Sequence, residues 1–273
     1  MSEPGPGLSP RVAPTVYGDG PGYGDAAEEY HEASKLHPAT VARELRGIAA
    51  LERNPQLLRL TAGRGRSHTA LPRIALPSPR VGPATLERTL RTRRSERLFR
   101  PEPLDQATLA TLLWCAYGAT GTLERGEGYA PQELRTVPSA GALYPLELHV
   151  AALRVEGLPR RVYRYEPLGH ELEQTRAIPD LDAVCPDPAL PGDAAAVVFV
   201  SATFWRSRVK YGLRAYRFTL LEAGHVLQNL LLAATALGLA AVVLGGFFDD
   251  PVDRLLDLDG VDESVLVGAC VGL

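Results

Sequence analysis

Residues 138–145 form a short segment with rigid ends and a centre that carries almost no side chains; they read Pro-Ser-Ala-Gly-Ala-Leu-Tyr-Pro. Each proline fixes its own φ angle and pushes the preceding residue toward an extended conformation. Because Ser139, Ala140, Gly141 and Ala142 are small, a flat ligand could approach the main chain and pair with its N–H and C=O groups. A tight turn that leads into a strand is the simpler explanation of the same residues.

Arginines and glycines elsewhere could bind an anion and the edge of a ring. Arg93, Arg94, Ser95 and Arg97 stand at the end of a predicted helix, where they could hold a dianionic phosphate by charge-assisted hydrogen bonds. A solvated basic surface is the alternative. The pair 245–246, Gly-Gly, follows a predicted strand, so a backbone N–H could point at a ligand without an intervening side chain. A simple turn would also use two glycines.

Lysine is rare in this chain. Of 29 basic residues only Lys35 and Lys210 are lysines, and codon bias in a GC-rich genome would explain the preference for arginine. A lysine kept against such a bias marks a position that requires an amine, because a desolvated amine can lose its proton whereas a guanidinium stays charged.

Glu222 and His225 are three residues apart in a predicted helix and therefore share one face. An acid/base pair or half of a metal site would use this spacing, but no second His or Cys joins them at ligand spacing. We therefore expect a buried structural hydrogen bond and no metal.

Helices and strands mix without a strict βαβ rhythm, so the expected fold class is α+β, with a mixed, mainly antiparallel sheet flanked by helices. The longest helix should span about 211–237, stop at Gly238 and be buried on several sides, as a central or dimer-interface helix requires. The other expected helices start near Thr85, Asp105 and Asp250. The expected strands are 146–155, 162–165, 195–200, 240–244 and 265–271, with loops at 121–134 and 176–193.

The Gly- and Pro-rich residues 1–27 should be a disordered tail. Residues 28–84 are expected to form a helical segment, which includes Val41 and Leu51, and then an extended arm over 61–83. Residues 85–273 make the main domain.

Composition excludes several classes of protein. The hydrophobic fraction of 45% and the charged fraction of 22% are ordinary for a soluble domain, and the net charge of −3 gives no nucleic-acid footprint. No apolar run approaches the roughly 20 residues of a membrane span. The three widely separated cysteines predict reduced thiols in a cytoplasmic protein.

The segment 138–145 resembles the flavin-loop signature of the nitroreductase family, in its SagB-type dehydrogenase branch, the azoline oxidases. Residues 30–35, Tyr-His-Glu-Ala-Ser-Lys, resemble the start of the same branch. Four further stretches match in the same order, so that the resemblance covers about residues 85–272. They are Arg93-Arg94-Ser95-Glu96-Arg97, Lys210-Tyr211-Gly212 with Arg214-Ala215-Tyr216-Arg217, Leu221-Glu222-Ala223-Gly224-His225 with Gln228-Asn229, and Gly245-Gly246-Phe247.

This resemblance implies an FMN cofactor, with two flavin sites built across a homodimer interface. The Arg-x-Ser group then holds the flavin phosphate, and Gly245 and Gly246 face the N5 edge. The implied loop contacts are Pro138, Ser139, Ala140, Gly141 and Leu143. Because nothing basic follows Arg254, Arg214 and Arg217 are the natural candidates to complete the phosphate site.

The resemblance also implies a reaction: oxidation of thiazolines or oxazolines to azoles in a modified peptide or small heterocyclic substrate, with dioxygen reoxidising the flavin. Lys210 and Tyr211 are the implied catalytic pair, and either would need a pKa below its ordinary value of about 10 to act as a base. An NAD(P)H-dependent nitro- or quinone reductase is the alternative. A third possibility is a flavin-free scaffold of a cyclodehydratase complex, and a cyclodehydratase is an expected partner of the enzyme as well.

Overall fold

A computed structural model describes residues 26–39, 41–54, 56, 71–124, 131–178, 181 and 184–273. The chain divides into two compact units, Met1–Val41 and Ala42–Leu273. In the first unit, α2 spans Ala26–Ala33, and the Ser34 hydroxyl after it donates to the Tyr30 carbonyl (2.6 Å). The rest of the predicted tail, residues 1–25, lies outside the described residues.

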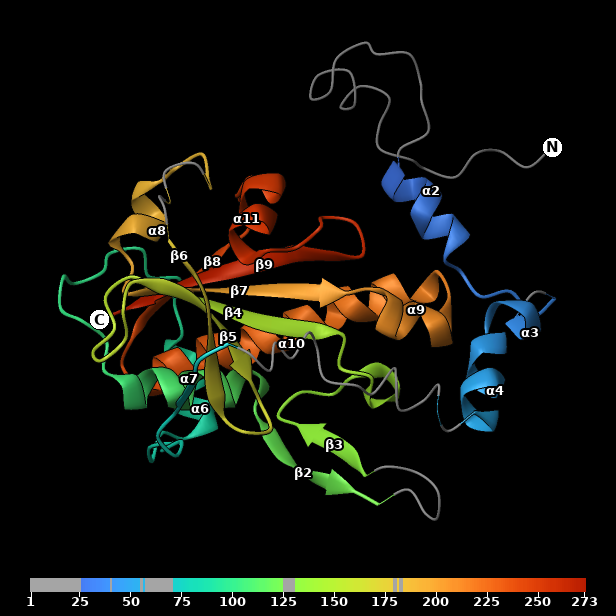
Figure 1. Ribbon diagram of the computed structural model, residues 1–273, viewed down its shortest axis with the longest axis horizontal. Coiled ribbons are helices and arrows are strands. Elements are labelled where there is room, and N and C mark those ends of the chain that lie inside the picture. Colours follow the sequence, from blue (N-terminus) through green and yellow to red (C-terminus); the bar gives the residue numbers. More distant parts are fainter. Residues whose placement is uncertain are drawn as a thin grey trace, which may run out of the picture. The chain divides into compact units, whose positions relative to one another are not determined.

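The second unit is built on a seven-stranded sheet in the order β1-β6-β5-β4-β7-β9-β8, in which every neighbouring pair is antiparallel (Figure 1). This confirms the predicted α+β class and the mainly antiparallel sheet. The strands are β1 (Arg73–Ala75), β4 (Leu146–Ala152), β5 (Arg161–Glu166), β6 (Glu171–Ala177), β7 (Ala196–Thr203), β8 (Ala240–Leu244) and β9 (Glu263–Gly272).

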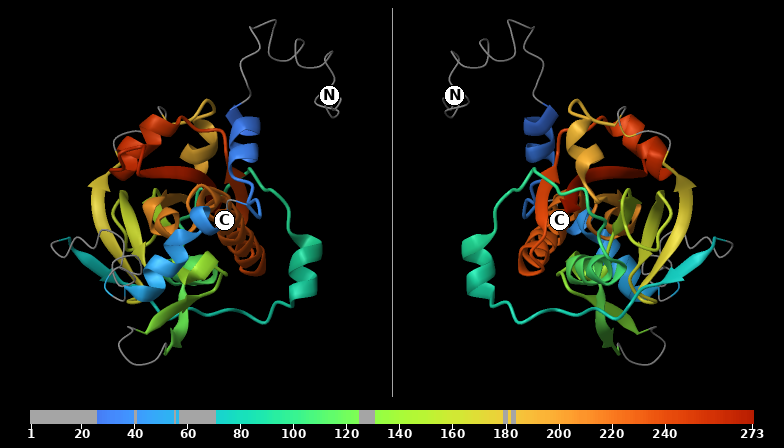
Figure 2. Two further views of the ribbon diagram at one scale, coloured as in Figure 1. Left: turned by 90° about the vertical axis from the view of Figure 1, so that its right-hand side faces the viewer. Right: turned by 90° about the vertical axis from the view of Figure 1, so that its left-hand side faces the viewer.

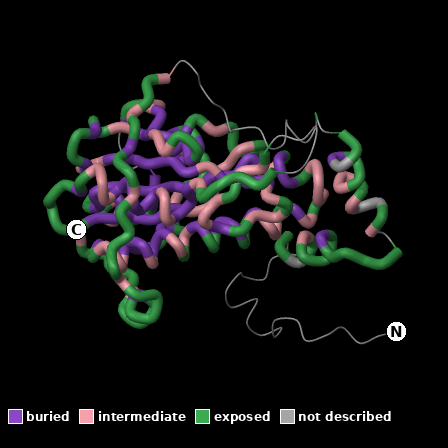
Figure 3. The backbone as a smooth tube through the Cα atoms, turned by 90° about the horizontal axis from the view of Figure 1, so that it is seen from below, coloured by how far each residue is buried: buried purple, intermediate pink, exposed green. Residues whose placement is uncertain are grey.

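Helices cover both faces of this sheet. On one face lie α7 (Gln106–Tyr117) and α10 (Arg214–Ala236); on the other lie α8 (Ala189–Asp193) and α11 (Asp249–Leu256) (Figure 1). Figure 3 shows the buried residues concentrated in the strands and in the helices that contact them. The protein therefore has two apolar cores, one on each side of the sheet.

Strand β4 shows how the sequence divides between these cores. Leu146, Leu148 and Val150 belong to the core beneath α7 and α10, because successive side chains of a strand point to opposite faces. Glu147 and His149 alternate with them and therefore face the α11 side. Polar side chains are thus placed in the interior of the unit on that side.

The predicted helix starts near residues 85 and 105 are confirmed. The Thr85 side chain accepts from Arg88 N–H ahead of α6 (Leu86–Thr92), and Asp105 accepts from Thr108 N–H ahead of α7. α6 contacts α10 and lies on its outer side, joined to the unit by extended segments (Figure 2).

The predicted start of the longest helix is wrong. Gly212 has φ 55° and ψ −136°, a conformation that ends one helix, α9 (Trp205–Tyr211), before α10 begins at Arg214. Gly238, with φ 74°, ends α10 as predicted. Within one chain, Gly224 and Leu221 of α10 are exposed, so burial on all sides stays a prediction that requires a second copy.

The predicted loops contain regular structure. β2 (Ala119–Leu123) and β3 (Gln132–Arg135) pair as antiparallel strands and overlap both ends of the predicted loop 121–134. Within 176–193 lies α8, and β6 reaches Ala177. The predicted arm supplies β1 as an edge strand, and ahead of it α3 (Val41–Glu44) and α4 (Arg46–Arg53) form within the predicted helical segment.

All three cysteines are free thiols, as predicted. Across the described residues, no helix combines the length and apolar character needed to cross a bilayer.

Candidate active site

The small-residue loop has a strained backbone. Gly141, Ala142 and Tyr144 all have positive φ angles, of 63°, 47° and 45°. An L-residue in this left-handed region costs on the order of 1–2 kcal/mol. Such strain persists only where surrounding contacts enforce it, and it concentrates at functional sites.

Buried polar contacts hold the loop from the α7 and α10 side. The Ser139 hydroxyl donates to Glu222 Oε2 (2.5 Å) and accepts from Tyr144 N–H (3.0 Å). The Tyr117 hydroxyl donates to the other oxygen of Glu222 (2.7 Å). This confirms the structural hydrogen bond expected for Glu222, whereas His225 is exposed and takes no part in it.

Lys210 and Tyr211, at the end of α9, also meet the loop. A Cβ atom placed on Gly141 would lie 2.6 Å from Tyr211 Oη and 2.7 Å from Lys210 Nζ. Only glycine therefore fits at this position, both for its φ angle and for the close approach of two functional groups. The structure brings together the loop and the predicted catalytic pair, which are about 70 residues apart in the sequence.

Aromatic packing fixes the position of the Tyr211 ring. It makes an edge contact with Phe218 (centroids 5.2 Å apart), and the Arg214 guanidinium lies 6.0 Å from the Phe218 ring centre. Burial raises the pKa of Tyr211, which is the opposite of the expected lowering. A raised pKa keeps the Tyr211 phenol protonated, so it can donate a hydrogen bond.

Helix α9 is attached to its surroundings on two sides. Arg206 pairs through Nη2 with Glu147 Oε1 (2.8 Å) and donates through Nη1 to the Tyr144 carbonyl (3.2 Å), so it connects α9 to the loop. On another side α4 packs closely, because a Cβ on Gly47 would lie 2.9 Å from the Lys210 carbonyl oxygen.

The predicted phosphate ligands follow α6 directly. Arg93 is half-buried, whereas Arg94, Ser95 and Arg97 are exposed. The Arg94 guanidinium folds back onto the helix end, where it donates to the carbonyls of Arg91 and Arg93 (3.0 and 2.8 Å). No carboxylate of the described residues pairs with these guanidinium groups, so their charge is available to an anion.

This arginine segment lies at the far end of the sheet from the loop. Glu96 N–H donates to the Ala241 carbonyl at the start of β8 (3.0 Å), and Arg100 N–H donates to the carbonyl of Leu273, just after β9 (2.7 Å). The loop lies where β4 begins and β7 ends, since Thr203 N–H donates to the Pro145 carbonyl (2.8 Å).

The two groups also lie at opposite ends of α10. Lys210 and Tyr211 precede the first turn of α10, whereas Arg94 lines a cavity of about 420 Å³ together with Thr235 and Gly238 at its last turn. With 23 residues, α10 is about 35 Å long. One chain therefore does not bring the predicted phosphate ligands to the predicted catalytic pair.

The remaining predicted residues lie on α10, after β8 and in the loop itself. Arg214 and Arg217, in the first turn of α10, lie beside the catalytic pair and not beside the arginine segment. Gly245 and Gly246 are exposed after β8, with open space where a Cβ would stand. Leu143 is 3% exposed, so its side chain anchors the loop and only its backbone could meet a ligand.

The sequence analysis missed residues that support the loop. The Arg135 guanidinium lies over the rings of Tyr117 and Tyr144 (4.4 and 4.7 Å to the centroids), and the Tyr144 hydroxyl accepts from Arg135 N–H (3.1 Å). Gln132 donates to the carbonyls of Gly141 and Ala142. Gln132 lies in the stretch 121–134 that was expected to be a loop, and Arg135 follows it directly, so neither gave a signal of these contacts.

Glu222 makes folding stability depend on pH. Burial raises the pKa of Glu222 to about 7, although hydrogen bonds from Ser139 and Tyr117 lower it. Because the folded pKa exceeds the unfolded value, this group's stabilisation is complete below about pH 4.5 and is lost as the pH rises through 7. We expect Glu222→Gln to raise the free energy of unfolding at pH 8.5 by up to about 3 kcal/mol relative to the wild type, with little change at pH 4.5. Urea unfolding at both pH values measures this; an equal change at the two would contradict it.

The site thus combines a strained small-residue loop with an amine and a phenol that lie against it. Residues 90–273 match the nitroreductase family, and the chain belongs to it. It is 35% identical over 192 residues to MJ1384 of Methanocaldococcus jannaschii, a protein named for that family, with 66% of this chain and 88% of that protein covered.

Two further relatives are named as processing proteins of microcin B17 and trifolitoxin. The microcin B17-processing protein McbC of Escherichia coli is 32% identical over 46% of this chain, and the trifolitoxin-processing protein TfxB of Rhizobium leguminosarum is 28% identical over 61%. The chain matches about half the length of each, 49% and 46%. These relatives confirm the predicted resemblance to the SagB-type branch.

Solved structures show the same fold. A nitroreductase-family structure from Ralstonia eutropha JMP134 superposes with a TM-score of 0.60 at 27% identity, over 77% of this chain and 91% of that one. A chain of the E. coli microcin synthetase McbBCD complex, bound to truncated pro-MccB17, superposes with a TM-score of 0.54 at 23% identity, over 90% of this chain and 91% of that one.

Proposed function

We propose that this protein is an FMN-dependent dehydrogenase that oxidises thiazolines or oxazolines in a peptide to thiazoles or oxazoles. The observation that carries the proposal is the contact of Lys210 Nζ and Tyr211 Oη with the backbone of Gly141. An amine and a phenol thus lie against the loop that resembles the flavin loop, where they can serve as base and hydrogen-bond donor. The similarity to McbC and TfxB supports a peptide substrate.

The residues present fit FMN. Gly141 and its neighbours expose backbone on which a flat ring can lie, and three arginine side chains without described carboxylate partners can bind a phosphate. Gly245 and Gly246 leave the edge of such a ring unobstructed. When bound, FMN would supply the hydride acceptor for the oxidation.

The chain's own groups handle the proton and the geometry. In its neutral form Lys210 Nζ takes a proton from one ring carbon of the azoline, while a hydride leaves the neighbouring carbon. The protonated Tyr211 hydroxyl donates a hydrogen bond to the substrate and so orients the ring. Glu222 fixes the loop through Ser139, and Arg206 fixes α9 against the same loop. Both act as positioning residues.

A second copy of the chain would complete each site. Leu213, Tyr216 and Leu220 form a stripe on α10 that is 38–52% exposed, and Leu86 and Leu90 are exposed on the neighbouring α6. Apolar side chains in such numbers mark an interaction surface. A two-fold axis across the middle of α10 would carry the arginine segment of one copy to the Lys210 end of the other.

Mixed dimers test this arrangement. One variant replaces Arg93 and Arg97 with Gln, and the other replaces Lys210 with Met; alone, each should have less than about 1% of wild-type azoline oxidation. Mixing them after brief dissociation should restore about a quarter of the wild-type rate, since half of the dimers are mixed and each has one intact site. Arg91→Gln, on exposed α6, is the control and should be active alone. If mixed dimers, verified by mass, showed no restored activity, each site would take its arginines and its Lys210 from the same chain.

The relative MJ1384 favours a second candidate function, a nitro- or quinone reductase that uses NAD(P)H. The match to a chain of the McbBCD complex, at 23% identity, extends to the fold alone. Assembly with a cyclodehydratase, or a scaffold role without flavin, is therefore a proposal from the resemblance. Purified protein that is colourless and does not take up FMN would support the scaffold.

A further inference from the structure

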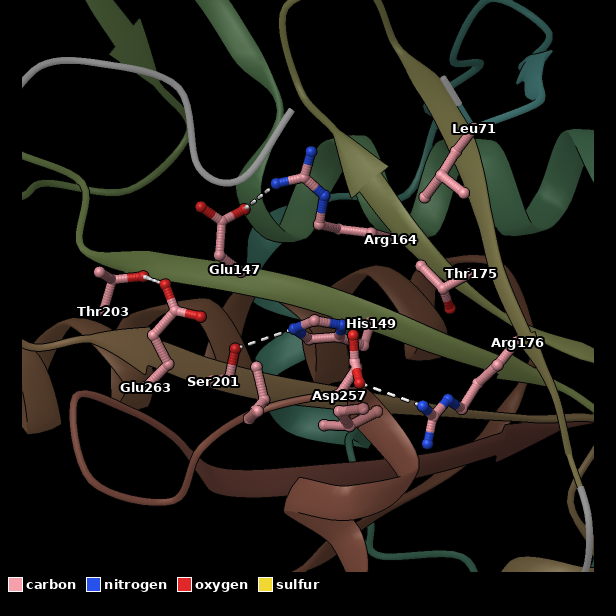
Figure 4. A pocket seen from close by; sticks show the side chains of 12 residues that line it. Leu71, Glu147, His149, Arg164, Thr175, Arg176, Ser201, Thr203, Asp257 and Glu263 are labelled. Carbon is pink, nitrogen blue, oxygen red and sulfur yellow. Dashed lines mark hydrogen bonds and ion pairs between the residues drawn. The ribbon is translucent and has the colours of Figure 1, made fainter. Parts of the chain in front are cut away.

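A cavity of about 250 Å³ lies on the α11 side of the sheet, away from the helices that support the loop. Its floor is made by side chains of β4, β5 and β7. Its walls come from the end of β6 and from residues 256–258 at the C-terminal end of α11 (Figure 4). The volume is more than ten times the roughly 10–15 Å³ that one water molecule requires. None of its lining residues belongs to the predicted flavin-binding or catalytic set.

The floor contains a buried histidine with an unused nitrogen. His149 is 4% exposed, and its Nε2 pairs with the Ser201 hydroxyl (2.9 Å). Among the described residues, its Nδ1 has no hydrogen-bond partner. Figure 4 shows the imidazole in the middle of the lining side chains. A buried polar atom without a hydrogen-bond partner destabilises the fold by about 1–3 kcal/mol, so we expect a ligand atom or an ordered water to pair with it.

The histidine is uncharged. Burial lowers the pKa of His149 to about 4, against an opposing effect of Glu147. Because the Ser201 hydroxyl can either donate to Nε2 or accept from it, Nδ1 can present a lone pair or an N–H. A ligand with a donor and an acceptor side by side can therefore pair with it in either tautomer.

Most of the charged lining groups lie in ion pairs, and the remaining one, Glu263, accepts a hydrogen bond from the Thr203 hydroxyl (3.3 Å). Arg164 binds Glu173 through Nε (3.0 Å) and Nη2 (2.6 Å) and lies 3.7 Å from Glu147. Glu147 also pairs with Arg206 (2.8 Å). At the outer wall, Arg176 pairs with Asp257 (3.1 Å). An added ion would have to break one of these pairs, at a high cost for the buried ones.

The apolar part of the wall comes from Leu71, Leu256 and Leu258. We propose that this cavity is a binding site for a small uncharged molecule that carries an amide, or a similar adjacent donor and acceptor, on an apolar ring. The amide pairs with His149, and the ring lies against the three leucines. The site is independent of the proposed flavin chemistry.

Three probes of one shape and different charge test the proposal: benzamide, benzoate and benzamidinium. Each is titrated into the full-length, FMN-treated protein with ¹⁵N-labelled histidine. Benzamide should shift the imidazole nitrogen signals of His149 in a saturable way and leave those of the exposed His225 unchanged. It should bind at least about tenfold more tightly than either ion. Tighter binding of benzoate or benzamidinium would overturn the proposed ligand class.

Two variants locate the binding. His149→Phe removes the ring nitrogens at similar volume, and Leu258→Trp fills the cavity from its half-buried wall. Each should weaken benzamide binding by about tenfold or more. Leu258→Trp retains His149, so its spectrum also shows whether the fold is intact. Unchanged benzamide affinity in a folded Leu258→Trp protein, or no binding of benzamide to the wild type, would leave a water-filled cavity and refute the site.

Discussion

Replacing Lys210 with methionine is expected to reduce azoline oxidation by about 10²–10⁴-fold while FMN remains bound. Methionine keeps an unbranched chain of similar length but has no amine, so the packing of α9 against the Gly141 backbone should survive. The rate should fall because the substrate proton then has no acceptor of suitable geometry. The visible spectrum measures bound flavin, and single-turnover mass analysis measures the chemical step.

The chain supplies its own control for this variant. Lys35 is the other lysine, and it forms an exposed pair with Glu32 (2.5 Å) in the first unit. Lys35→Met should retain the wild-type rate. If Lys210→Met also retained it, or lost activity only by losing FMN, Lys210 would not be the base.

The second large effect is expected at Gly141. An alanine there must adopt φ 63° and place its Cβ 2.6–2.7 Å from Tyr211 Oη and Lys210 Nζ. Both side chains would have to move, and a misplacement of about 1 Å can cost about 10²-fold in rate. We therefore expect Gly141→Ala to lower the oxidation rate by about 10²-fold, with destabilisation of about 1–2 kcal/mol from the left-handed backbone.

An alanine at Gly157 distinguishes the effect of the steric clash from the effect of the left-handed backbone. It has φ 72°, but its Cβ position meets no atom within 4 Å. Gly157→Ala should show a similar loss in the free energy of unfolding and an unchanged rate. Equal rates for the two alanine variants would show that the close approach of Lys210 and Tyr211 to the loop is unimportant.

Local signals predicted much of the fold. Asp105 and Thr85 mark helix starts because their side chains accept backbone N–H groups, and the apolar run that begins at Ala195 marks a strand buried on both faces. The polar residues of β2 and β3 show no alternation, so their hairpin had no such signal. The break at Gly212 was missed because apolar residues continue on both sides of it.

The site was predictable in part. The identity of the loop and of Lys210 followed from residue types and motif order, and the structure places them in contact. The loop and Lys210 lie far from Arg93 and Arg97 because the two groups reach opposite ends of the sheet. Strand order decides which end each segment reaches, and local sequence does not reveal it. His149 gave no signal because a single histidine in an apolar strand is most often a core residue.

The most direct measurement of the central claim uses FMN-loaded protein, a peptide with one thiazoline ring, dioxygen and no nicotinamide cofactor. The account predicts that the peptide loses two hydrogen masses, and that the Lys210→Met protein leaves it unchanged. A peptide that keeps its mass with the wild-type protein, while the same protein oxidises NADH with a nitroaromatic, would contradict the account and establish the reductase.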